Sequence, residues 1–103
     1  MAKIERFEDM EAWKASREVA KLVNDMTKRE PFCRDFALVN RIRRASVSVL
    51  PNIARGFERD GTKEFINFLA IAKGSCDEVR TQLYVAFDQG YTDEAMFRRA
   101  SEN

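Results

Sequence analysis

Three long stretches of the chain place hydrophobic residues at intervals of three and four, which is the spacing of an amphipathic helix. The first stretch runs from about Asp9 to Arg29, and Pro31 prevents its continuation. Lys28 and Arg29 lie at its end, where the helix dipole favours positive charge. Its apolar face consists of Met10, Trp13, Ala15, Val19, Ala20, Leu22, Val23 and Met26. We therefore predict a first helix over this stretch.

The second stretch runs from about Asp35 to Arg59. Its apolar stripe consists of Leu38, Ile42, Ala45, Val49, Ile53 and Phe57. The β-branched run from Ala45 to Val49 would also suit a strand. Because the stripe continues at helical spacing on both sides of that run, we predict a helix throughout.

The third stretch begins after the break at Asp60-Gly61-Thr62, and Gly90 is predicted to end it as a residue with positive φ. Its stripe consists of Phe65, Phe68, Leu69, Ala72, Cys76, Val79, Leu83, Ala86 and Phe87. Thr92 is then the expected N-cap of a fourth, short helix from Asp93 to about Ser101. Since short connections make neighbouring helices antiparallel, we predict an all-α antiparallel up-down four-helix bundle with a short fourth helix, forming one domain over residues 1–103.

The residue inventory excludes most catalytic and metal chemistry. The 103-residue chain contains no histidine, so histidine bases, histidine metal sites and Ser-His-Asp or Cys-His nucleophiles are excluded. Two cysteines are too few for a Cys-rich zinc site, and no glycine-rich phosphate loop occurs. Cys76 is expected to be an inert core residue, and Cys33 an accessible loop residue. We therefore expect no enzymatic activity, no cofactor, no metal and no catalytic residue.

The hydropathy of the chain also predicts its surroundings. No apolar run approaches the roughly 20 residues that cross a bilayer, and Met1–Phe7 lacks the apolar core of a secretory signal. We therefore expect a cytoplasmic protein with reduced thiols and without a membrane partner.

Three sequence patterns together resemble a known family. They are Phe7-Glu-Asp-Met-Glu-Ala-Trp13, the stretch from Arg41 to Phe57 that contains Pro-Asn-Ile-Ala-Arg-Gly, and the stretch from Lys63 to Leu83 that contains Gly-Ser-Cys-Asp-Glu-Val-Arg-Thr-Gln-Leu, followed by Gly90-Tyr91. The chain resembles the four-helix bundle proteins encoded in intervening sequences of large-subunit ribosomal RNA genes. That family is similar to the accessory variability proteins of diversity-generating retroelements.

The resemblance implies a bundle that assembles with copies of itself into a ring, typically a pentamer, and that has no enzymatic activity. For the retroelement relatives it implies a basic surface that partners a reverse transcriptase and its RNA. The sequence departs from the family in two ways. Arg55 stands where the family usually has Glu, and the family's fourth helix is longer than the twelve residues that follow Tyr91.

Positive charge is concentrated in the middle of the chain, although the net charge is only +1. Residues 28–63 hold nine Lys or Arg against four Asp or Glu, a net charge of +5, whereas the two flanking segments are acidic. We therefore predict weak, sequence-tolerant binding of RNA or DNA through Arg41, Arg55 and Arg59 on the outer side of the second helix. The competing interpretation is a solvated face, because the net charge is near zero and no RNP1 motif occurs.

A second group of polar residues falls where the second and third helices are expected to meet. Arg43 or Arg44 is predicted to reach Glu78 across that contact and to fix the register of the helices, with Asn52 beside them. Gly74, together with Ala70, is predicted to permit close approach of another helix, within the bundle or between subunits.

Two functions compete on this evidence. The first is a homo-oligomeric adaptor or scaffold associated with nucleic acid, and the second is a purely structural oligomer that binds other proteins.

Overall fold

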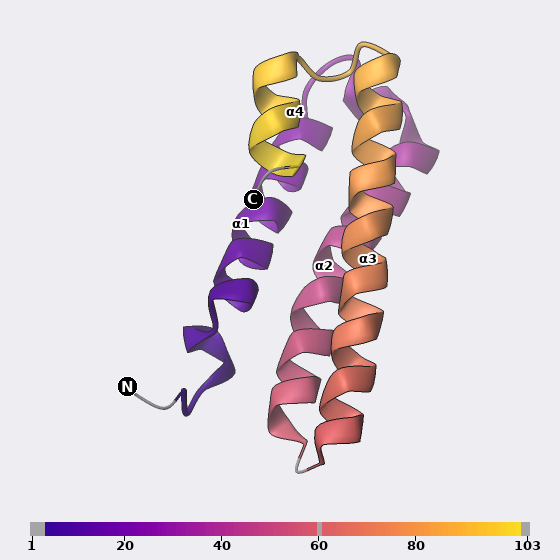
Figure 1. The fold of residues 1–103 in the computed structure, drawn as a ribbon. Helices are drawn as coiled ribbons and strands as arrows, with labels where there is room; N and C mark the ends of the chain where they lie inside the picture. The colour runs from indigo at the N-terminus through magenta and orange to yellow at the C-terminus, as the bar shows by residue number, and fades with distance from the viewer. Residues whose placement is uncertain (1–3, 60, 102–103) are drawn as a thin grey trace.

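The computed structural model describes residues 4–59 and 61–101, and every regular element within them is helical. The helices are α1 (Glu11–Thr27), α2 (Phe36–Glu58), α3 (Thr62–Asp88) and α4 (Glu94–Ser101), and short 3-10 turns precede α1 (η1, Phe7–Asp9) and α2 (η2, Phe32–Arg34). Figure 1 shows α1, α2 and α3 running in alternating directions, with α4 turning back between the ends of α3 and α1. The predicted up-down four-helix bundle with a short fourth helix is confirmed.

The central helix of the bundle is α2, which packs along α3 over most of its length and also against α1. By contrast, α1 and α3 scarcely touch each other, and α4 joins them only at one end. The reason is the apolar stripe predicted for α2, of which Leu38, Ile42, Ala45, Val49 and Ile53 are all buried. The result is an elongated molecule of 44 × 25 × 17 Å.

The buried side chains form two clusters of unequal size. The larger cluster lies at the end that α4 covers, and its members include Val23, Phe32, Ile42, Leu83, Ala86 and Ala100. The smaller cluster consists of Val49, Ile53 and Ala72, against which Met10, Trp13 and Leu69 pack. The ring of Phe7 meets Trp13 edge-on, with the ring centres 5.4 Å apart. Trp13 is therefore a half-buried core aromatic, as predicted.

The end of α3 is closed by a Schellman motif centred on Gly90. The φ angle of Gly90 is +78°, which a glycine adopts without strain. The N–H of Tyr91 donates to the carbonyl of Ala86 at 2.9 Å, and the N–H of Gly90 donates to that of Phe87 at 3.0 Å. The predicted role of Gly90 is thus confirmed.

The N-cap of α4 lies one residue later than predicted. Asp93 rather than Thr92 caps the helix, because its Oδ1 accepts a hydrogen bond from the N–H of Met96 at 2.8 Å.

Two chain reversals far apart in sequence are joined at one end of the bundle. The hydroxyl of Tyr91 donates to Oδ2 of Asp35 at 3.0 Å, while Oδ1 of Asp35 accepts from the N–H of Leu38 and so caps α2. The ring of Tyr91 stacks on Phe32, with the ring centres 5.2 Å apart. The hydrogen bond to Asp35 raises the pKa of Tyr91, so the hydroxyl keeps its proton as the donor.

Two glycines within helices have opposite surroundings. Gly56 is buried against α3, and a Cβ atom there would lie 3.1 Å from Cβ of Phe68 and 3.3 Å from the carbonyl oxygen of Phe65. A Cβ atom at Gly74 would meet nothing within 4 Å. The prediction that Gly74 permits close approach within the bundle is therefore wrong; Gly56 has that function, and an approach between subunits at Gly74 stays a prediction.

Over the described residues, no helix combines the length and the apolar character that are needed to cross a bilayer.

Candidate nucleic-acid interface

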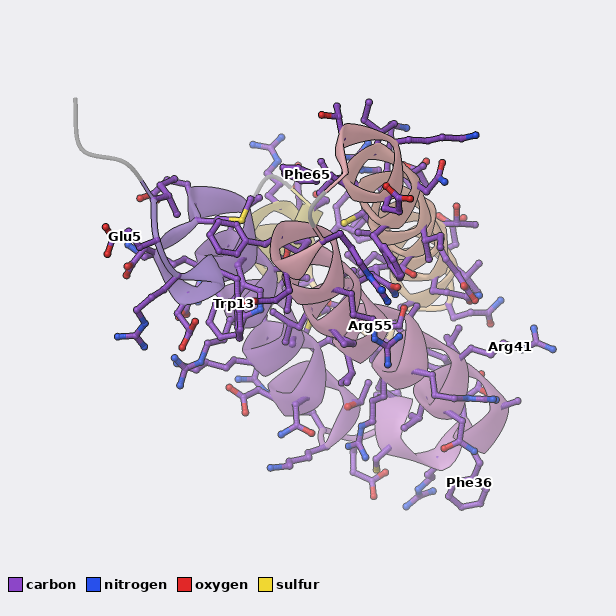
Figure 2. All side chains as sticks on the ribbon, turned by 90° about the horizontal axis from the view of Figure 1, so that it is seen from below. Glu5, Trp13, Phe36, Arg41, Arg55 and Phe65 are labelled. Carbon is purple, nitrogen blue, oxygen red and sulfur yellow. The ribbon has the colours of Figure 1, made fainter. Side chains whose placement is uncertain are left out.

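Four exposed arginines lie along one flank of α2, and we call Arg41, Arg44, Arg55 and Arg59 the arginine row. At 100° per residue, their spacing places all four within about 60° of each other around the helix axis. The row is about 27 Å long at a rise of 1.5 Å per residue. Arg59 is the residue directly after the last turn of α2. Figure 2 shows Arg41 and Arg55 projecting from α2 on the side away from α1.

The position of the row is set by the contact between α2 and α3. Ser48, which lies between Arg44 and Arg55, makes a hydrogen bond of 2.6 Å to the hydroxyl of Ser75 on α3. Asn52 turns back onto its own helix, where its side-chain nitrogen donates to the carbonyl of Ser48 at 2.7 Å. The row therefore runs along the side of α2 that borders the contact with α3.

The arginine row lies outside the ion pairs of the described chain. Six ion pairs join described residues, and each pairs near neighbours in sequence, such as Arg34 with Glu30 at 2.7 Å and Arg98 with Glu94 at 2.8 Å. No arginine of the row lies within ion-pair distance of a carboxylate of the described chain. The row therefore takes part in no ion pair of the described chain, although Glu58 lies close to its Arg55 and Arg59 end.

Arg59 has a different neighbour, because its guanidinium lies over the ring of Phe68 at 5.1 Å from the ring centre. This cation–π contact holds the guanidinium plane against α3 without neutralising its charge. One end of the row is therefore more ordered than a free arginine would be.

The predicted contact of Arg43 or Arg44 with Glu78 is not formed. Nε of Arg43 donates instead to Oγ1 of Thr27 on α1 at 2.8 Å. Glu78 is exposed, and no ion pair joins it to either arginine. The physical reason is the helical rotation of 100° per residue, which turns Arg43 toward α1 and Arg44 toward solvent beside α3.

Arg44 is the functional candidate that sequence reasoning assigned elsewhere. Arg44 lies three, eleven and fifteen residues from Arg41, Arg55 and Arg59. These separations are close to one, three and four turns of an α-helix. Helical spacing alone could therefore have included it in the basic surface.

An apolar groove opens on another side of the bundle, between α1 and α3, because these two helices scarcely touch. The groove has a volume of about 240 Å³ and ends at the C-terminal turn of α4. Its lining consists mainly of small and apolar side chains, among them Ala12, Ala15, Val19, Val49, Val79, Leu83 and Ala100.

Cys76 lines this groove and is exposed, so the prediction that it lies in the core is wrong. The side chain of Cys76 lies on the side of α3 that faces α1, but the two helices are too far apart there for α1 to cover it. Desolvation, with a smaller contribution from the charge of Asp77, raises the pKa of the Cys76 thiol. Because the thiolate is disfavoured, Cys76 has no sign of nucleophilic activation. Cys33 is half-buried in the turn before α2.

The described residues also contain no cluster of three or more His, Cys, Asp or Glu side chains that could hold a metal ion.

Comparison with known proteins agrees with this geometry. No curated protein matches the chain significantly. The model of the family described as 23S rRNA-intervening sequence protein matches residues 8–103, which is nearly the whole chain and includes all four helices. The protein therefore belongs to the 23S rRNA-intervening sequence protein family.

Proposed function

We propose that this protein is a non-enzymatic, homo-oligomeric adaptor or scaffold that associates with nucleic acid through the arginine row. The observation that carries this proposal is the alignment of four exposed guanidiniums, unpaired with described carboxylates, on one flank of one helix. The net charge of the chain is only +1, yet residues 28–63, which contain the row, carry a net charge of +5. Phosphate groups are the anions that such a row fits, because each guanidinium binds a phosphate through paired N–H groups.

The competing interpretation is a solvated face. Some cations on the other helices pair with carboxylates three or four residues away, such as Lys21 with Glu18 and Lys73 with Asp77. Others, such as Arg17 and Arg80, are exposed and have no ion pair within the described chain. What distinguishes the row is that its four guanidiniums share one flank of α2, where Glu58, three residues after Arg55, is the neighbouring carboxylate on the same helix. A surface with this charge distribution is typical of polyanion binding.

The test is binding of labelled RNA and DNA by fluorescence anisotropy over a salt series. In the row variant, Arg41, Arg44, Arg55 and Arg59 are all replaced by Gln. We expect its affinity at low salt to fall at least tenfold. The slope of log K against log salt is expected to flatten by about three to four units, since each phosphate contact contributes about −0.7 on single strands and −0.9 on duplex.

The matched control removes the same charge from other surfaces, by replacing Lys14, Lys21, Lys73 and Arg98 with Gln. These four cations all belong to ion pairs with near neighbours. The control is expected to bind nearly as well as the wild type, and both variants should keep the circular dichroism of a helical protein. Absence of wild-type binding at low salt, or equal losses in the two variants, would leave the structural oligomer as the better proposal.

Assembly with copies of itself is the second part of the proposal, and the apolar groove between α1 and α3 supports it. The bundle's own fourth helix covers only one end of the groove, so the lining residues Ala12, Ala15, Val19 and Cys76 keep part of their surface exposed. A helix of a second copy would remove this surface from water. We expect multi-angle light scattering to give a mass several times 11.9 kDa, most simply five times. A mass of 11.9 kDa at micromolar concentration would contradict assembly.

The biological partner belongs to the same proposal. A relation to the accessory variability proteins of retroelements would make a reverse transcriptase and its RNA the expected partner. A structural oligomer that connects other proteins remains the alternative, and salt-independent association with a protein would favour it.

A further inference from the structure

The middle of α2 carries a second apolar stripe on its outer side, away from the core. Val47, Leu50, Pro51 and Ala54 follow one another at the spacing of one helix face, and we call them the outer stripe. Val47 is 57% exposed, Pro51 is exposed, and Leu50 and Ala54 are half-buried. The segment from Val47 to Ala54 contains no charged residue on any side. A helix that is apolar on two sides is typical of one that is covered on both.

The outer stripe also contains a backbone acceptor without its usual helical donor. Pro51 lies inside α2 and has no N–H, so it cannot donate to the carbonyl of Val47 four residues before it. Because Val47 and Pro51 are both exposed, this carbonyl is accessible from outside the bundle. A surface that covers the stripe must therefore bring a hydrogen-bond donor.

The apolar groove between α1 and α3 offers one such donor. Among the described residues that line the groove, Arg80 is the single charged one, and it belongs to none of the ion pairs. The hydroxyls of Ser16, Ser46 and Ser101 each donate to a carbonyl of their own helix. The Arg80 guanidinium is therefore the group in this lining with N–H donors to spare.

We propose that the outer stripe of one copy occupies the apolar groove of the next copy, with Arg80 donating to the carbonyl of Val47. This inference rests on the assembly part of the proposed function, since it names the surface that enters the groove. The apolar stripe covers the apolar lining, and the acceptor of one surface meets the donor of the other.

The dimensions of the two surfaces agree. The lining extends from Ala12 to Val19 on α1 and from Cys76 to Leu83 on α3. Each of these spans covers seven residues, as does the outer stripe, and seven residues rise about 10.5 Å along a helix. The wall on α1 is built of small side chains, which permits a helix to approach closely.

The contact is heterologous, because the groove and the outer stripe lie on different sides of the molecule. Each copy presents its stripe to one neighbour and its groove to another, so the contact can join more than two copies. The centre of the arginine row lies about 100° around α2 from the centre of the stripe. The row therefore faces another direction and stays accessible to nucleic acid in the assembly.

The experiment places one arginine on each surface and measures mass by light scattering at micromolar concentration. Val47→Arg blocks the stripe and Ala12→Arg blocks the groove, and both positions are exposed, so circular dichroism should stay that of the wild type. Each variant alone is expected to have a mass of 11.9 kDa. The matched control is Ile66→Arg, at a residue of α3 that is 60% exposed and lies outside both surfaces, and it should keep the wild-type mass.

Mixing the two blocked variants tests the heterologous geometry. Val47→Arg keeps its groove and Ala12→Arg keeps its stripe, so an equimolar mixture is expected to form a pair with twice the mass of 11.9 kDa. A mixture that stays monomeric, or a Val47→Arg variant that keeps the wild-type mass, would overturn this inference while assembly itself stood. If the wild type were a monomer, the assembly proposal would fail and this inference with it.

Two further variants test the hydrogen bond between the copies. Pro51→Ala restores the N–H that pairs the carbonyl of Val47 within α2, and is expected to weaken association about fivefold without loss of helicity. Arg80→Met removes the donor and is expected to weaken association about tenfold, whereas the control Arg17→Met, at an exposed residue of α1, should not. Sedimentation over a dilution series measures these constants. Unchanged association in both Pro51→Ala and Arg80→Met would overturn the proposed bond.

Discussion

Replacing Phe32 by alanine is expected to lower the free energy of unfolding by about 3–5 kcal/mol. The side chain is fully buried in the larger core cluster, and its ring stacks on Tyr91. Truncation therefore leaves a cavity and removes one of the contacts that join the two chain reversals at this end. Urea unfolding followed by circular dichroism would measure the change.

The control for this prediction is Phe36→Ala, because Phe36 lies only four residues away and is 74% exposed. The same truncation there is expected to change the free energy of unfolding by less than about 0.5 kcal/mol. Comparable losses in the two variants would mean that Phe36 is covered in solution, for example by a second subunit. A small loss in Phe32→Ala would contradict the packing of the larger cluster.

Replacing Gly56 by valine is expected to destabilise the bundle by about 1–3 kcal/mol. The backbone of α2 approaches α3 so closely at Gly56 that even a Cβ atom would lie 3.1 Å from Cβ of Phe68. Two more methyl groups must push the helices apart along the contact that holds Ser48 against Ser75. Thermal and urea unfolding would both report the loss.

Gly74→Val makes the same substitution in the neighbouring helix, where nothing lies within 4 Å of an added Cβ atom. Valine has a better helix propensity than glycine, so this variant is expected to be as stable as the wild type or slightly more stable. If Gly74→Val were the more damaging change, the close approach predicted at Gly74 would exist between subunits. The mass from light scattering would then fall as well.

The helices could be predicted from the sequence because each has a strong local signal. The stripe of α2, the break before Thr62 and the positive φ of Gly90 depend on residues close together in the chain. For the same reason the error at the start of α4 is small, since Thr92 and Asp93 are adjacent and both can cap a helix.

The side-chain partners could not be predicted as well, because they depend on which neighbour lies on which side of a helix. Arg43 and Arg44 are adjacent in sequence, yet one contacts Thr27 of α1 and the other joins the arginine row. Cys76 lies on an apolar stripe, but its side of α3 faces α1 where the two helices are apart. The gap between α1 and α3 arises from tertiary packing, which no local pattern contains.

The unequal core clusters make the two ends of the bundle unequally resistant to opening. At one end the larger cluster and the bond from Tyr91 to Asp35 hold the helices, whereas the buried side chains described at the other end form the smaller cluster of Val49, Ile53 and Ala72. Local opening is easiest where the fewest apolar contacts must break. Arg41 and Arg44 lie toward the firm end, while Arg55 and Arg59 lie toward the weak one. Opening of the weak end would separate Arg59 from the ring of Phe68 on α3, whereas Arg41, Arg44 and Arg55 all lie on α2 and would keep their spacing.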